Sequence, residues 1–163
     1  YGSEFPGFLQ TFPPAAHLGY LADVARLELA IRHSYHAADA IPVPHRTLAT
    51  IPPETFLSLV PVLSPALRLI VSDWPIHSIW RANTEPGTPA PGMRPESVVV
   101  MRPGFDPVPH ILPPGADAFL ASLLGGGSFA AAIDAAGEGH DLTATLSLLI
   151  SGGAICGLSG EPN

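Results

Sequence analysis

One stretch of the chain, His17 to Asp39, limits the fold more than any other because it can form a long helix. Pro13 and Pro14 precede it at positions suited to the first turn of a helix, and Pro42 ends it. Between Gly19 and Pro42 neither glycine nor proline interrupts the sequence. Apolar residues recur at helical spacing around most of its circumference, which is typical of a helix that the rest of a domain packs against. We therefore predict a central helix over residues 17–39.

Glu28 falls within one apolar arc of this predicted helix, one turn from Val24 and from Arg32. A buried carboxylate is unfavourable unless a cation pairs with it. The pattern therefore favours a buried ion pair between Glu28 and either Arg32 or Arg68. A catalytic carboxylate is the alternative.

Short elements separated by prolines are expected in the rest of the first half. They are a helix over 2–11, a helical turn over 45–50, a short helix over 53–59, a strand over 62–71 and a helical turn after Trp74-Pro75. Pro65 confines that strand to a sheet edge or a bend. Residues 84–95 lack periodicity and are rich in proline, glycine and threonine, which is typical of a linker or a long hairpin.

The second half has a different pattern, with two strands, three helices and a final strand. The expected bounds are strands 97–102 and 108–112, helices 117–124, 129–136 and 142–150, and a strand 154–158. Ser128 and Asp141 are placed to cap the second and third of these helices. We predict an α+β protein, mainly α, with a helical domain over 1–83, a linker over 84–96 and a winged-helix-like module over 97–163.

The distribution of charge disfavours nucleic acid as a partner. All seven basic residues are arginine, and the formal net charge is −7. Residues 84–163 carry −6 of this charge, whereas DNA affinity rests on neutralising phosphates with Lys and Arg. A helix-turn-helix interpretation would use 141–151 as its recognition helix, and that segment has no basic residue, Asn or Gln with which to read bases.

Three stretches of sequence resemble a known family. They are YGSEFPGFLQTFPPAAHLGYLADVARLELAIRHSYHAADA (1–40), PALRLIVSDWPIHSIWRAN (65–83) and VVVMRPG (98–104). They resemble the HvfC-like proteins, which are often labelled DNA-binding domains and whose relatives include the MbnC subunit of methanobactin biosynthesis. Typical members have a further helical segment before the point where this sequence begins. The resemblance therefore implies that the chain is the C-terminal part of a longer one.

The resemblance also implies a function. The family is commonly paired with a separate iron-dependent TIM-barrel enzyme that modifies cysteines of a small ribosomally made peptide. We therefore expect a non-catalytic partner subunit that binds the precursor peptide through the module over 97–163. The iron would belong to the other protein, and no cofactor is expected in this chain. A DNA-binding or transcription regulatory protein that uses the same module is the alternative.

Motifs for catalysis or metal binding are sparse. The chain has no phosphate-binding glycine loop and no nucleophile elbow, so we predict no catalytic residue. His33, His36 and Asp39 follow one another at helical spacing, which some metal sites use, although histidines near a helix C-terminus are also favoured electrostatically. Cys156, the single cysteine, lies in an apolar run and is predicted to act as a small buried hydrophobic residue.

Two surfaces are candidates for partners. Trp74, Trp80 and Arg81 could form an interface with another protein, although burial in the core is the alternative for both tryptophans. The second surface is the β-branched run Val98, Val99, Val100 and Met101, where a peptide could add as a strand. Ordinary pairing inside a sheet is the alternative for this run. An acidic module would favour a peptide segment that carries Lys or Arg.

The sequence also bears on location. No signal peptide is evident, and the longest uncharged run, 142–160, is interrupted by Gly152-Gly153. We therefore expect a cytoplasmic protein that does not enter a membrane.

Overall fold

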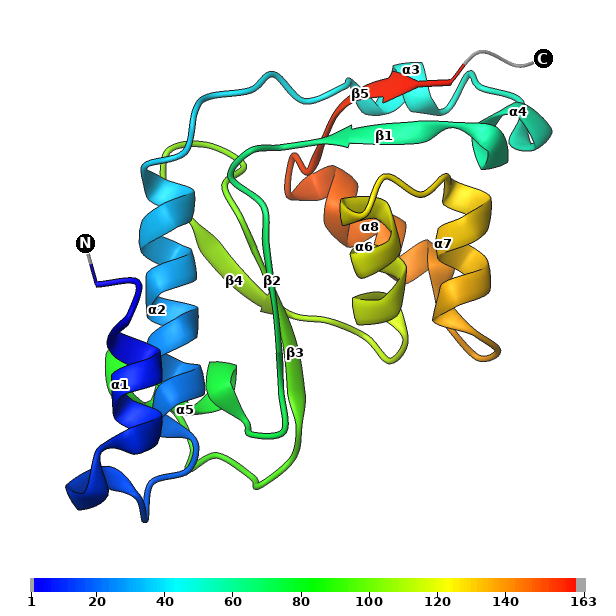
Figure 1. The fold of residues 1–163 in the computed structure, drawn as a ribbon. Helices are drawn as coiled ribbons and strands as arrows, with labels where there is room; N and C mark the ends of the chain where they lie inside the picture. Colours follow the sequence, from blue (N-terminus) through cyan, green and yellow to red (C-terminus); the bar gives the residue numbers. More distant parts are fainter. Residues whose placement is uncertain (1, 161–163) are drawn as a thin grey trace.

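The structure, a computed structural model, describes residues 2–160 and has a mainly helical α+β fold (Figure 1). Its helices are α1 (Phe5–Thr11), α2 (Leu21–Tyr35), α3 (His45–Leu48), α4 (Pro53–Ser58), α5 (Ile76–Thr84), α6 (Ala116–Leu124), α7 (Phe129–Ala136) and α8 (Leu142–Ser151), with a 3-10 turn at Pro13–Ala15. Its strands are β1 (Val60–Leu63), β2 (Arg68–Ser72), β3 (Glu96–Met101), β4 (Val108–Ile111) and β5 (Ile155–Ser159). Each element predicted from the sequence has a counterpart here. The predicted strand over 62–71 is divided in two by the bend at Pro65.

A three-stranded antiparallel sheet in the order β2-β3-β4 forms the middle layer of the molecule (Figure 1). Its two faces are both covered, because β3 alternates its side chains between two cores. Val98 and Val100 belong to the core shared with α2 and α5. Val99 and Met101 belong to the core shared with α6 and α8. The sheet therefore separates α2 and α5 from α6, α7 and α8, and the short helices α3 and α4 lie on the side of α7 and α8.

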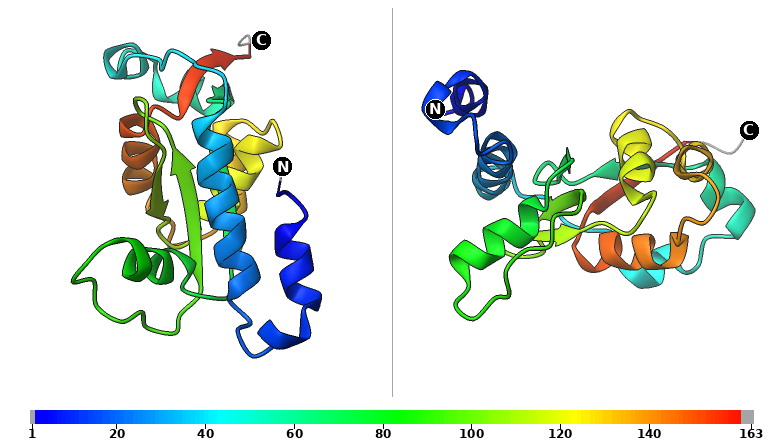
Figure 2. Two further views of the ribbon diagram at one scale, coloured as in Figure 1. Left: turned by 90° about the vertical axis from the view of Figure 1, so that its left-hand side faces the viewer. Right: turned by 90° about the horizontal axis from the view of Figure 1, so that it is seen from below.

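The central helix is shorter than predicted, since α2 spans Leu21–Tyr35 rather than residues 17–39. Before its start, Gly19 lies against the ring of Trp74, where a Cβ would approach Cζ2 to 2.8 Å. After its end, Arg102 donates hydrogen bonds to the carbonyls of Tyr35 (2.7 Å) and Ala37 (3.0 Å). Arg102 therefore satisfies carbonyls that the end of α2 leaves without a helical donor. Figure 2 shows α2 with α5 on one side of it and α1 on the other.

Helices α6, α7 and α8 follow the predicted bounds closely because two of them have the predicted caps. The hydroxyl of Ser128 accepts a hydrogen bond from the N–H of Ala131 at 3.2 Å, at the start of α7. The carboxylate of Asp141 accepts one from the N–H of Ala144 at 2.8 Å, at the start of α8. The strands of this half do not form one sheet, however, because β3 and β4 pair with β2 whereas β5 pairs with β1.

The predicted division into domains over 1–83 and 97–163 is wrong, because both sheets join strands from the two halves. In the middle layer β2 pairs with β3, and in the second sheet β1 pairs with β5. The bend at Pro65 is the physical reason. It directs β1 and β2 to different partners beyond residues 84–96, so the loop over these residues connects two parts of one unit.

Candidate functional site

The two edges of the middle sheet are β2 and β4, and the sheet register determines where each backbone group points. The N–H of Leu112 donates to the carbonyl of Ser97 at 2.8 Å. Bonded positions alternate along an antiparallel pair. Every second residue of β3, counted from Ser97, therefore directs its backbone groups toward β4. The residues between them direct theirs toward β2.

The same alternation identifies the open positions of β2. Arg68, Ile70 and Ser72 are in register with the residues of β3 that face β2, so their backbone groups point into the sheet. Leu69 and Val71 lie between them, and their N–H and C=O groups point away from the sheet. Within residues 2–160, no hydrogen bond from outside the sheet reaches these groups. The outer edge of β2 is therefore unpaired.

The opposite edge, on β4, offers one backbone donor fewer. Pro109 occupies one of its outward-facing positions and has no N–H to offer. Ile111 occupies the other and lines a small pocket of about 240 Å³ together with α5 and residues 88–92. His77 of α5 lines the same pocket, and its pKa is lowered mainly by burial, an effect that the nearby Glu96 opposes. An extended chain would therefore find its open edge at β2.

A groove of about 510 Å³ lies along the outer edge of β2. Residues 68–71 form one side of this groove, α2 contributes one helical face, and the α1 segment lies opposite. Ser3, just before α1, and Pro6 and Gly7 of α1 line this side of the groove. Figure 2 shows α1 beside α2, on the side away from α5.

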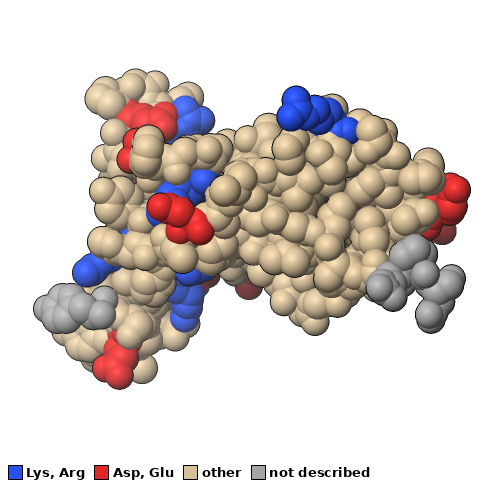
Figure 3. Space-filling model, turned by 90° about the horizontal axis from the view of Figure 1, so that it is seen from above, with Lys and Arg blue, Asp and Glu red and all other residues tan. Residues whose placement is uncertain are grey.

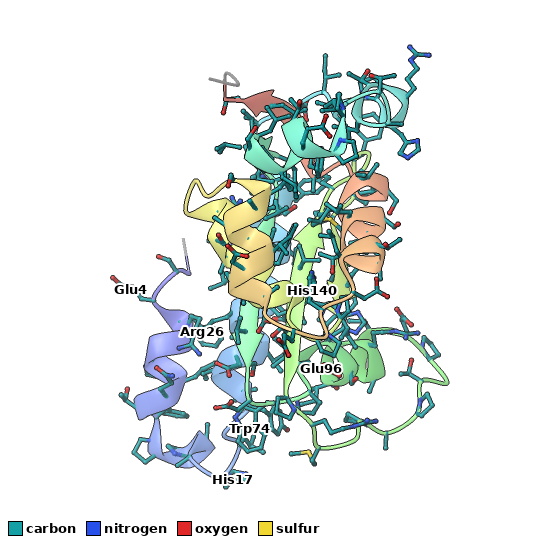
Figure 4. All side chains as sticks on the ribbon, turned by 90° about the vertical axis from the view of Figure 1, so that its right-hand side faces the viewer. Glu4, His17, Arg26, Trp74, Glu96 and His140 are labelled. Carbon is teal, nitrogen blue, oxygen red and sulfur yellow. The ribbon has the colours of Figure 1, made fainter. Side chains whose placement is uncertain are left out.

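The face of α2 in this groove is formed by residues at helical spacing. Arg26, Leu29, Ala30 and His33 line the groove, and residues three or four apart share one side of a helix. Arg26 projects beside α1 (Figure 4). It forms an ion pair with Asp23.

Asp23 also ties α2 to the sheet. Its second carboxylate oxygen accepts a hydrogen bond from the hydroxyl of Ser72 at 2.6 Å, and that hydroxyl accepts one from the N–H of Trp74 at 3.1 Å. Both oxygens of Asp23 are therefore occupied inside the structure. The carboxylate holds Arg26 and the end of β2 in fixed positions.

Arg68 is the basic residue contributed by β2. Its Nη1 donates to the carbonyls of Pro65 and Leu67, both at 2.7 Å, which anchors the side chain to the preceding turn. Within the part of the chain that the structure describes, no carboxylate pairs with it. We call the set of Arg26, His33 and Arg68 the basic cluster. No Asp or Glu of residues 2–160 lines the groove beside them.

A second groove, of about 410 Å³, lies between α3, α4 and α8 and is lined almost entirely by apolar side chains. Leu142, Leu146 and Ile150 of α8 line it, each four residues from the next. Leu48 of α3 and Phe56 of α4 line it as well. Figure 3 shows that the end of the molecule carrying α3 and α4 is mostly uncharged on the face seen from above. This face of α8 is therefore directed at its own chain and carries no basic side chain.

The predicted peptide-binding edge at Val98, Val99, Val100 and Met101 is wrong. These residues form β3, which is the middle strand and is paired on both sides. Their side chains are at most 1% exposed. The reason is that β2, from the first half of the chain, pairs along the edge that the sequence left open.

The predicted buried ion pair is also wrong. Glu28 and Arg32 are both exposed, and no salt bridge in the described range 2–160 involves Glu28. The helix buries a face formed by Leu27, Ala30 and Ser34, and Glu28 lies outside this face, on the side of Arg32 and Tyr35. Its carboxylate therefore stays hydrated and needs no partner.

The three candidate metal ligands contact different parts of the molecule. His33 belongs to the groove beside β2, and His36 is the C-cap residue of α2. Asp39 accepts a hydrogen bond from Arg102 at 2.9 Å. In the range 2–160, no group of three or more His, Cys, Asp or Glu residues is placed to hold a metal ion.

The aromatic interface candidates contribute to the core. Trp74 and Trp80 are partly buried against the core shared by α2, α5 and the sheet. Arg81 is exposed and forms an ion pair with Glu85 at 2.6 Å. Only part of each tryptophan side chain is left at the surface. The predicted interface stays a prediction.

No helix among residues 2–160 is long and apolar enough to cross a membrane. Comparison of the sequence with protein-family models, with curated proteins and with solved structures found no match in any of the three.

Proposed function

We propose that this chain is a non-catalytic subunit that binds an extended peptide along the outer edge of β2. The unpaired backbone groups of Leu69 and Val71 carry this proposal, because they lie beside a groove of about 510 Å³. An extended peptide satisfies such groups as an added strand and needs little particular sequence to do so. Within the middle sheet, the edge at β4 offers one backbone donor fewer because of Pro109, which favours β2 as the place for such an addition.

The resemblance to the HvfC-like proteins supports a more specific form of this proposal. In that form the chain is the partner subunit of an iron-dependent TIM-barrel enzyme, and the peptide is a ribosomally made precursor whose cysteines that enzyme modifies. Two of the three resembling stretches build the groove, since residues 1–40 supply α1 and α2 and residues 65–83 supply β2. This chain would then contribute peptide binding, and the enzyme would hold the iron.

Val71→Pro tests the proposed edge directly. Proline removes the outward N–H of Val71 and leaves the hydrogen bonds from β2 to β3 in place. The probes are three fluorescent synthetic peptides of about seven residues, a usual strand length, in which valine alternates with Glu, with Gln or with Lys. At least one peptide should bind the parent chain. Loss of one backbone hydrogen bond should weaken that binding by about five- to tenfold in fluorescence anisotropy.

Val71→Ala is the matched control, because it removes the side chain and keeps the N–H. It should lose only the contact made by the two methyl groups and should therefore bind the same peptide more tightly than Val71→Pro does. Circular dichroism and thermal melting establish that both variants are folded. A folded Val71→Pro chain that binds as tightly as Val71→Ala would place the docking site elsewhere.

A further inference from the structure

The groove along β2 has a local charge opposite to that of the whole chain. The formal net charge is −7, yet the groove is lined by the basic cluster of Arg26, His33 and Arg68 and by no described Asp or Glu. Asp23 pairs with Arg26, which leaves Arg68 as the arginine of the groove that has no carboxylate partner in the described part of the chain. This reversal of sign bears on which peptide the groove would accept.

A strand added to β2 would place its alternate side chains on two different surfaces. Arg68 and Ile70 lie on the side of the sheet that faces α2, because Ile70 packs in the core shared with that helix. Peptide side chains on this side would lie beside the basic cluster. Leu69 and Val71 lie on the opposite side, where both side chains are apolar and Val71 is 62% exposed. The two sides therefore differ in the chemistry that they offer.

We propose that the groove selects an extended segment that carries Asp or Glu at alternate positions and apolar residues between them. This proposal rests on the proposed function and adds the chemical class of the peptide. Carboxylates facing the basic cluster gain charge-assisted hydrogen bonds from a guanidinium whose planar fork matches them. Apolar residues on the other side cover Leu69 and Val71 and remove them from water.

The selection follows from the charges that line the groove, because charges elsewhere on the molecule act only weakly on a peptide bound there. At physiological salt, charges farther apart than about 8 Å are largely screened. Figure 3 shows charged side chains of both signs at the α1–α2 end. Among the residues that line the groove, the formally charged ones are Arg26 and Arg68. The expected preference is therefore opposite to the Lys- or Arg-bearing segment that the acidic second half suggests.

The test measures the affinities of the Glu, Gln and Lys peptides for the parent chain and for variants at Arg68. The Glu peptide should bind about tenfold more tightly than the Lys peptide, with the Gln peptide between them, and the preference should shrink as salt rises. Arg68→Gln should weaken the Glu peptide about fivefold and change the Gln peptide little. Arg68→Glu should reverse the order of the Glu and Lys peptides.

Arg46→Gln is the matched control, because Arg46 is an exposed arginine on α3 away from this groove, and it should leave all three affinities unchanged. His33→Gln, on the exposed face of α2, tests the same cluster if the Arg68 variants lose their fold. Equal binding of the three peptides, or preference for Lys, with sensitivity to Val71→Pro retained, would overturn the selection and leave the proposed function standing. Absence of binding by every peptide would overturn both.

Discussion

Arg102 joins the end of β3 to the end of α2, and its side chain is only 9% exposed. Its guanidinium donates to the carbonyls of Tyr35, Ala37 and Ala38 and to the carboxylate of Asp39. Arg102→Ala should lower the free energy of unfolding by about 2–3 kcal/mol, because these carbonyls lose their donors and the helix end loses its cation. Urea denaturation measures the change.

Arg102→Lys separates charge from geometry at the same position. A lysine keeps the cation and cannot reach several acceptors in a fixed fork, so about half of the loss should remain. Arg94→Ala is the control, since Arg94 is an exposed arginine of the loop between α5 and β3. If Arg102→Ala and Arg94→Ala unfold at the same urea concentration, the attachment of α2 through Arg102 contributes nothing.

Single residues show where the sequence was sufficient and where it was not. The caps at Ser128 and Asp141 could be predicted because a cap depends on neighbours three residues away. The environment of Glu28 could not, because helical periodicity places a residue on an arc and does not say which arc meets the sheet. Cys156 was predicted to be buried in an apolar setting, and the structure has it partly buried with the pKa of its thiol raised by burial.

At the scale of elements, Glu96 attaches the start of β3 to the start of α5. Its carboxylate accepts hydrogen bonds from the N–H groups of His77 (2.9 Å) and Ser78 (3.0 Å) and from the hydroxyl of Ser78 (Figure 4). Glu96→Ala should lower the free energy of unfolding by about 1–3 kcal/mol, because α5 has no other side-chain cap.

Glu96→Gln should fall between the parent and Glu96→Ala, since the amide oxygen still accepts and the negative charge at the helix N-terminus is gone. Glu138→Ala removes an exposed carboxylate from the turn after α7 and serves as the control. Differential scanning calorimetry compares the three melting temperatures with that of the parent. Equal melting of Glu96→Ala and Glu138→Ala would show that the cap does not hold α5.

The positions of the strands could be predicted from the sequence, but their pairing into sheets could be predicted only in part. Val98 to Met101 is a continuous apolar run bounded by turn residues, a pattern consistent with burial on both faces. Pro109 was likewise a signal for an edge strand. The identity of the partners was not predictable, because β2 and β5 lie far from β3 and β1 in sequence and no local pattern specifies such a pairing. The groove along β2 depends on that pairing and was missed for the same reason.

At the scale of the whole molecule, the choice between peptide and DNA follows from charge and from the position of α8. The chain carries −7, and α8 has no basic side chain, while its apolar residues Leu142, Leu146 and Ile150 face α3 and α4. At physiological salt the chain should not retard duplex DNA at micromolar concentration, because nonspecific affinity requires several cations in contact with phosphates. A gel-retardation series at rising salt provides the measurement. Micromolar binding that falls steeply with salt would favour the DNA-binding alternative.

The pairing of β1 with β5 also governs the order in which the molecule can assemble. Residues 60–63 have their strand partner at 155–159, so that sheet cannot close on a nascent chain until nearly a hundred further residues have been synthesised. Contacts of such sequence separation are slow to form, since a long loop must be ordered first. Until then β1 exposes an unpaired edge, which is the kind of surface that chaperones shield and that aggregation exploits.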